Sequence, residues 1–337
     1  MCMIRRLVVF VLCVVMAFMI IGCQEKAPEK NVEKIILNEV THSVFYAPMY
    51  AAISLGYFEE EGLEIELVNG GGADKSMTAL LSGQADVGLM GPEAAIYVFN
   101  EGRENSAMVI GQLTKRDGSF LVGREPDEDF KWTDVAGKTI IGGRKGGVPE
   151  MTLEYVLRKN GLEPGVDVFV DTSIQFDLMG GAFEGGVGDY VTLFEPTASM
   201  FEKEGKGYIL AAVGQESGEV PFTAFQTTKS YIKENPDIIR RFLKAIYRGQ
   251  QWVQKASDKE LAEAIVDFFP DTSIEALMMV AKSYREIDAW MDTPIMKKEA
   301  FDRLQEIIIQ AGVLTEKVDF ENVVDNSFAE EVVKMIG

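Results

Sequence analysis

The chain has 337 residues, 47% of them hydrophobic, and a formal net charge of −20 at pH 7. This length is sufficient for two domains of ordinary size. A chain this acidic has no excess of cations to neutralise phosphates, which excludes nucleic acid as an expected partner. His42 is the single histidine, so a two-histidine metal site and a pair of catalytic imidazoles are excluded as well.

The first 22 residues predict a lipoprotein signal peptide. Two arginines precede the apolar block 7–21, which is shorter than the roughly 20 apolar residues of a membrane span. Ile20-Ile21-Gly22-Cys23 resembles the bacterial lipobox. The resemblance implies cleavage before Cys23, a lipid on that cysteine and attachment to the extracytoplasmic face of the cell membrane. The alternative is a plain signal anchor that ends in cysteine. The polar residues 23–33 predict a flexible tether.

The three cysteines, Cys2, Cys13 and Cys23, all lie in this region. Cleavage would remove the first two, and the third would carry the lipid, so the mature chain would have neither a free thiol nor a disulfide. Metal clusters built on cysteine and a cysteine nucleophile are therefore excluded. We expect no metal and no cofactor.

Strands and helices alternate over residues 34–113. Short apolar or alternating runs predict strands, and runs with helical spacing that end at glycine or begin near proline predict helices. The alternation indicates a mainly parallel sheet with helices on both faces. The expected strands are 34–40, 63–68, 85–90 and 107–113, and the expected helices are 45–55, 74–82 and 93–100.

A second unit of the same kind follows a strand at 119–123 and a polar insert at 124–134. A later strand at 222–227 is expected to return to the first unit, so the chain crosses between the units near 120 and 221, which are natural hinge positions. The expected strands of the second unit are 138–142, 166–171, 187–193 and 208–213, and its helices are 149–159, 176–183 and 195–203.

After residue 228 the apolar residues follow helical spacing alone. Trp252, Phe268 and Trp290 are interpreted as core anchors of these helices rather than as site residues. We predict a first lobe of residues 34–120 plus 222–337 and a second lobe of residues 121–221. The expected helices are 236–256, 258–268, 273–286 and 297–311, followed by one or two short helices in 319–337.

Two segments carry a resemblance to a known family: residues 41–58 (THSVFYAPMYAAISLGYF) and 79–88 (ALLSGQADVG). They resemble the extracytoplasmic substrate-binding components of ABC importers for nitrate, sulfonates, taurine and thiamine-type pyrimidines, and the resemblance extends over residues 34–255. It implies a monomer that binds a small molecule and delivers it to a permease and its ATPase. His42 and Tyr46 resemble the thiamine-pyrimidine branch, where Asn-His-Thr-Gly leaves the first strand; this chain has Thr41-His42-Ser43-Val44 there.

The expected fold is therefore α/β and two-lobed, a type II periplasmic-binding-protein fold in which each lobe is a mixed sheet flanked by helices. The ligand is expected in the cleft between the lobes, because ligands of open α/β sheets bind beyond the carboxyl ends of the strands. Five loops are predicted to follow strand ends and to supply the ligand contacts.

The first loop contains His42, Ser43 and Tyr46. The histidine and the tyrosine could stack on or hydrogen-bond to a flat ring, or instead cap the next helix and fill the core. The second loop is 69–72, where Gly71 would let a ligand approach backbone amides; the alternative is a plain turn before a helix.

The third loop contains Gly91 and Glu93, whose carboxylate could accept from a ligand amine or simply complement a helix dipole. The fourth loop, 142–147, is glycine-rich and contains Arg144 and Gly146. It could hold an anion on its amides, but it lacks the Gly-Lys-Ser/Thr ending of a nucleotide-binding loop.

The fifth loop runs from residue 185 to 196 and contributes Asp189, Tyr190 and Glu195. The family resemblance implies that an acidic residue here grips an aminopyrimidine, and a carboxylate pairs well with an N–C–N edge. The alternative for Glu195 is a charge at a helix start.

Glu93, Asp189 and Glu195 together outnumber Arg144 and Lys145, and burying an anion beside carboxylates is costly. We therefore expect a neutral or cationic nitrogen heterocycle of the thiamine-precursor pyrimidine type, with an alkanesulfonate or taurine as the alternative. A sensor lipoprotein with the same fold is the alternative of another class. Eukaryotic relatives of the family that make the pyrimidine with iron carry a cysteine-rich motif that is absent here, so we expect no enzymatic activity.

Overall fold

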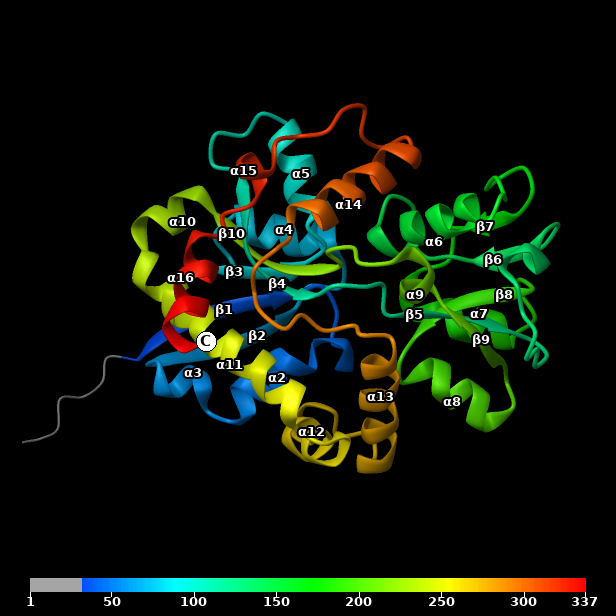
Figure 1. The fold of residues 1–337 in the computed structure, drawn as a ribbon, viewed down its shortest axis with the longest axis horizontal. Coiled ribbons are helices and arrows are strands. Elements are labelled where there is room, and N and C mark those ends of the chain that lie inside the picture. The colour runs from blue at the N-terminus through cyan, green and yellow to red at the C-terminus, as the bar shows by residue number, and fades with distance from the viewer. Residues whose placement is uncertain (1–31) are drawn as a thin grey trace, which may run out of the picture. The chain divides into compact units, whose positions relative to one another are not determined.

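The first sheet combines the strands predicted before residue 114 with one late strand. In the computed structural model, which describes residues 32–337, β1 (Glu33–Glu39), β2 (Leu63–Asn69) and β3 (Val87–Met90) run parallel. β10 (Thr223–Thr228) lies antiparallel between β3 and β4 (Ala107–Thr114), so the strand order is β2-β1-β3-β10-β4 (Figure 1). The predicted return of the chain to this sheet is confirmed.

The second sheet has the strand order β7-β6-β8-β5-β9. β6 is parallel to both β7 and β8, whereas β5 is antiparallel to β8 and β9, so this sheet is mixed like the first. Its strands are β5 (Ser119–Gly123), β6 (Thr139–Ile141), β7 (Phe169–Asp171), β8 (Tyr190–Phe194) and β9 (Tyr208–Ala212).

One strand boundary differs from the prediction in a way that affects the site. The sequence predicts a strand over 187–193, but β8 begins at Tyr190. Gly186 and Gly188 have φ angles of 94° and 69°, in the left-handed region that extended strands do not use. The loop 185–189 therefore precedes β8, and its predicted position at the carboxyl end of a strand is wrong.

Helices connect the strands and cover both sheets (Figure 1). The predicted helix 45–55 divides into a 3-10 turn, η1 (Val44–Tyr46), and α2, and several elements of three to six residues were not predicted. The helices between strands are α2 (Ala47–Ser54), α3 (Tyr57–Glu60), α4 (Ala73–Leu81), α5 (Glu93–Asn100), η2 (Trp132–Val135), α6 (Val148–Lys159), η3 (Phe176–Leu178), α7 (Met179–Glu184), α8 (Thr197–Glu204) and α9 (Val213–Ser217).

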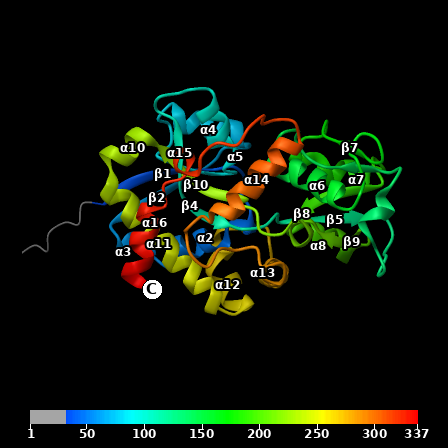
Figure 2. The same ribbon diagram turned by 45° about the horizontal axis from the view of Figure 1, so that its top comes forward.

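The remaining helices follow β10, as predicted. α11 has proline at its first position and buries Phe242, Leu243 and Ile246 against the first sheet unit, where α11 contacts α2 and α16 (Figure 2). These helices are α10 (Lys229–Glu234), α11 (Pro236–Lys255), α12 (Asp258–Ile265), η4 (Val266–Phe268), α13 (Ile274–Glu286), α14 (Lys298–Gln310), α15 (Phe320–Val323) and α16 (Ser327–Ile336).

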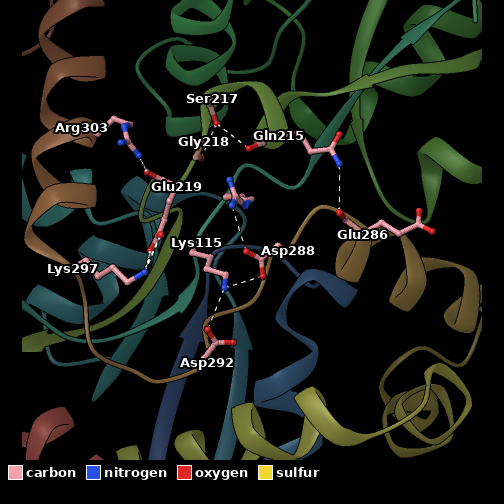
Figure 3. A network of polar contacts seen from close by, with 12 residues as sticks. Lys115, Gln215, Ser217, Gly218, Glu219, Glu286, Asp288, Asp292, Lys297 and Arg303 are labelled. Atoms are coloured by element: carbon pink, nitrogen blue, oxygen red, sulfur yellow. Dashed lines mark hydrogen bonds and ion pairs between the residues drawn. The ribbon is translucent and has the colours of Figure 1, made fainter.

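The chain passes from the first sheet to the second through residues 115–118 and returns through 218–222. These two crossing segments are joined by a hydrogen bond from the Val220 amide to the Lys115 carbonyl. Figure 3 shows the polar contacts around them: Lys115 pairs with Asp288 and Asp292, and Glu219 with Lys297. The segment between α13 and α14 is therefore joined to both crossing segments by ion pairs.

The three aromatic residues predicted to anchor the helical region differ in burial. Trp290 is buried, and its indole Nε1 donates to the Phe45 carbonyl oxygen at 2.9 Å. Trp252 and Phe268 are half-buried and pack against the core. None of the helices in residues 32–337 is both long and apolar enough to span a membrane. The predicted signal peptide and the lipidation of Cys23 lie outside the described residues.

Candidate ligand-binding site

The first four candidate loops and the end of the fifth, at Glu195, lie at one edge of each sheet. The parallel strands β1, β2 and β3 place their carboxyl ends at the same edge of the first sheet, and β6, β7 and β8 do so in the second. Contacts between loops of the two sheets are direct. The Tyr97 hydroxyl in α5 donates to the Gly146 carbonyl oxygen at 3.3 Å, and the ring centroids of Phe45 and Phe194 lie 5.7 Å apart.

In the first loop, His42 is engaged by protein groups on both ring nitrogens. Nδ1 lies 2.8 Å from Oε1 of Glu39, and Nε2 donates to the Phe268 carbonyl oxygen at 2.8 Å. The ring also stacks on Phe269 at 4.7 Å, and the Tyr50 hydroxyl donates to Glu39 Oε2. The hydrogen bond to the Glu39 carboxylate raises the pKa of His42, which favours the imidazolium. The His42 side chain therefore links η4, through Phe268, to Glu39 at the end of β1.

The other two residues of the first loop also have structural partners. Ser43 accepts a hydrogen bond from the Phe45 amide at 3.2 Å, as an N-cap of η1. Tyr46 is 3% exposed, and burial raises the pKa of its hydroxyl. The core interpretation that the sequence left open describes Tyr46, whereas the cap that it assigned to His42 is provided by Ser43.

The second loop exposes Gly71, whose amide donates to Asn69 Oδ1 at 3.0 Å. Beneath this loop lie two buried polar atoms without a hydrogen-bond partner in the described chain, Oδ1 of Asn38 and Oγ of Ser76. Both lie against Gly70. Buried polar atoms of native proteins are usually hydrogen-bonded, so a water or a bound polar group would satisfy these two.

The third loop carries the most unusual side chain of the site. Glu93 is 3% exposed, and its Oε2 has no hydrogen-bond partner among residues 32–337. Burial raises the pKa of Glu93 to about 7, and the backbone amides of Glu93 and Ala94 and the nearby Arg144 guanidinium oppose this rise. Gly91 lies against the Glu93 carboxyl group, and a side chain at this position would displace that group.

Gln226 extends this polar region across the first sheet. It pairs with Gly88 of β3, and so does Asn38 from the opposite side, so both side chains flank the same residue. The Gln226 amide nitrogen donates to the Gly91 carbonyl oxygen at 3.0 Å, whereas its Oε1 is buried and unpartnered within the described chain. Asn38, Ser76, Glu93 and Gln226 therefore present mostly acceptor atoms.

The fourth loop is held by its own helix. The Gly146 amide donates to Oε2 of Glu150 in α6 at 3.0 Å, which removes that amide from the donors available to an anion. Burial raises the pKa of Glu150 to about 7. Arg144 is exposed, and Lys145 lines a pocket of about 350 Å³ together with Phe169 and Ser173.

The fifth loop divides between the two ends of β8. Asp189 accepts from the Thr139 amide at 2.9 Å, and Tyr190 lies 6.4 Å from Phe130, both at the amino end of the strand. Glu195 is at the carboxyl end, where its two carboxylate oxygens accept from the amide and the hydroxyl of Ser199, at 3.0 and 2.7 Å. Its carboxylate therefore caps the start of α8, as in the alternative interpretation.

Sequence reasoning missed Asn38, Ser76, Tyr97 and Gln226. The sequence does not single out Asn38 or Gln226, because β1 and β10 contain other polar residues, although both side chains are buried in the structure. A polar side chain there must be satisfied or await a partner. No group of three or more metal-ligating side chains exists in the part of the chain that the structure describes.

Comparison with solved structures identifies the fold. The alkanesulfonate-binding protein SsuA from Xanthomonas axonopodis pv. citri, solved with MOPS bound, matches with a TM-score of 0.70 at 14% identity, covering 87% of this chain and 98% of its own. The periplasmic nitrate-binding protein NrtA from Synechocystis PCC 6803 gives a TM-score of 0.69 at 16% identity, covering 92% and 90%. The predicted periplasmic-binding-protein fold is confirmed.

Sequence comparison defines the family. The candidate binding protein YtlA of Bacillus subtilis (strain 168) is 41% identical over 320 residues, 95% of this chain and 96% of its own length. The family model "NMT1/THI5 like" matches residues 44–259. The chain belongs to the NMT1/THI5-like family of ABC-importer substrate-binding proteins. This family membership confirms the prediction of a binding protein rather than an enzyme.

Proposed function

We propose that the protein captures a small nitrogen heterocycle that carries N–H donors, of the aminopyrimidine type, outside the cytoplasm and delivers it to an ABC permease and its ATPase. The observation that carries this proposal is Glu93: a carboxyl group 3% exposed, with Oε2 unpartnered in the described chain, at the carboxyl end of β3. A ligand N–H would supply the missing partner.

The energetics favour a donor over an anion. Leaving a buried acceptor without a hydrogen bond costs about 1–3 kcal/mol, which a ligand donor recovers. An anion next to ionised Glu93 would add a repulsion that the exposed Arg144 offsets weakly, because water screens its charge. The acceptor atoms of Asn38 and Gln226 provide further partners for an amino group.

An alkanesulfonate or taurine is the second candidate, favoured by Arg144 and by the SsuA fold likeness. It requires Glu93 to be protonated, and pH therefore separates the candidates. Because the pKa of Glu93 is about 7, a donor ligand should bind more tightly above pH 7 and a sulfonate more tightly below it.

The test is calorimetric titration of the protein with aminopyrimidines and with taurine between pH 5.5 and 8.5. Glu93→Gln should weaken pyrimidine binding by about 10-fold or more, since a hydrogen bond to a charged group is worth about 1.5–3 kcal/mol. Glu128→Gln removes an exposed carboxylate of the polar insert and serves as the control. Tight taurine binding without pyrimidine binding contradicts the proposal.

We also propose that a lipid on Cys23 holds the monomeric protein at the membrane near its permease. Cys23→Ala should release the protein from the membrane fraction, and mass spectrometry of the wild-type amino terminus should detect the acyl groups. A neighbouring pair of genes for a permease and an ATPase supports transport, whereas a neighbouring kinase gene alone supports a sensor.

A further inference from the structure

An aromatic ring stands exposed at the carboxyl end of β7, on a loop that the expected site did not include. Phe176 is 42% exposed, and Phe169, at 58%, is the other aromatic side chain of residues 32–337 with more than a third of its surface exposed. The two differ in position: Phe169 begins β7, whereas Phe176 follows its carboxyl end.

Phe176 is the open end of a row of packed rings. Its centroid lies 5.5 Å from that of Phe194, at the end of β8, and Phe194 lies 5.7 Å from the buried Phe45 of η1. The row therefore begins in the core beside the first loop of the site and ends in solvent at Phe176. Packing fixes Phe176 on one side and leaves the rest of its ring accessible.

The same loop lies beside the fourth loop of the site. A side-chain atom at Gly143 would be 4.0 Å from the sulfur of Met179, the residue that begins α7 three positions after Phe176. Gly143 immediately precedes Arg144, whose charge acts on Glu93. The helix that follows Phe176 therefore packs beside the fourth loop of the site.

We propose that Phe176 is a specificity-determining residue that stacks on the face of a flat aromatic ligand while Glu93 accepts a hydrogen bond from its edge. This inference rests on the proposed function. Such a ligand would gain from stacking on Phe176, because burying the ring removes apolar surface from water and aromatic faces attract one another in offset or tilted geometry.

The test compares Phe176→Leu with Phe169→Leu. Leucine keeps apolar bulk but removes the aromatic face, and both substitutions are at exposed positions of the same strand and its loop. Calorimetry with a 4-amino-2-methylpyrimidine probe should give a dissociation constant about 2- to 10-fold higher for Phe176→Leu and unchanged for Phe169→Leu. Thermal unfolding of each variant verifies that the fold is intact.

A second measurement reports on stacking directly. Ring protons of the pyrimidine should shift upfield in NMR spectra when bound to the wild type, and less when bound to Phe176→Leu. Equal affinity and equal ring-proton shifts in the two proteins overturn the stacking role while leaving the proposed function intact. A wild-type protein that binds taurine, or nothing, in place of the pyrimidine overturns the proposed ligand class and the stacking role together.

Discussion

Replacing Glu93 by Gln tests whether ionising the buried carboxyl group destabilises the folded protein. The ordinary pKa of a glutamate is 4.5, and burial raises that of Glu93 to about 7. One pKa unit corresponds to about 1.36 kcal/mol, so ionising Glu93 in the folded state costs about 3 kcal/mol. Because the folded pKa is raised above the unfolded one, protonated Glu93 adds to the free energy of unfolding. This contribution is fully present below pH 4.5 and is lost as the pH rises through about 7.

Glutamine keeps the shape of the side chain but does not titrate. The free energy of unfolding of Glu93→Gln minus that of the wild type should therefore rise by about 3 kcal/mol between pH 4.5 and 8, whatever its constant offset. Urea unfolding followed by circular dichroism at several pH values measures this difference, and equal slopes against urea show that the same transition is compared. A difference that does not change with pH refutes the reasoning.

Two further predictions concern groups outside the ligand contacts. His42→Ala should lower the free energy of unfolding more at pH 6 than at pH 8.5. The reason is that a raised histidine pKa adds stability below about pH 6.5, and this stability disappears as the pH rises through the folded pKa. Urea titrations at both pH values measure the loss, and an equal loss at the two contradicts the prediction. Asp288 has a φ of 53°, so Asp288→Asn should be less destabilising than Asp288→Ala by about 1 kcal/mol, since asparagine tolerates the left-handed region; equal midpoints in urea would contradict this.

The succession of strands and helices could be predicted because glycine and proline separate the elements. Prediction failed where two glycines and an apolar residue precede a strand: Val187 looks like part of β8, but Gly186 and Gly188 take up conformations that no strand uses. This local error moved a whole loop to the wrong end of the sheet, and with it Asp189 and Tyr190.

Side-chain roles were less predictable than loop positions. His42 follows β1 as expected, yet its partners are Glu39 and Phe268, and the second lies 226 positions further along the chain. Long-range partners of this kind leave no local pattern. Asn38 and Gln226 were missed as well, because other polar residues, such as Glu39 and Thr227, stand beside them in β1 and β10.

The sequence predicts the ligand class from a count of charged residues in the loops. The structure adds where each charged side chain lies and how deeply it is buried. Of the three acids, Asp189 lies at the other end of β8 and Glu195 is occupied by Ser199, so Glu93 remains. Of the two cations, Lys145 lines the pocket beside β7, and Arg144 is the one whose charge acts on Glu93. One acid against one base would be neutral by count, but water screens exposed Arg144 and hardly reaches Glu93. The local environment therefore still favours a ligand that donates hydrogen bonds over an anion.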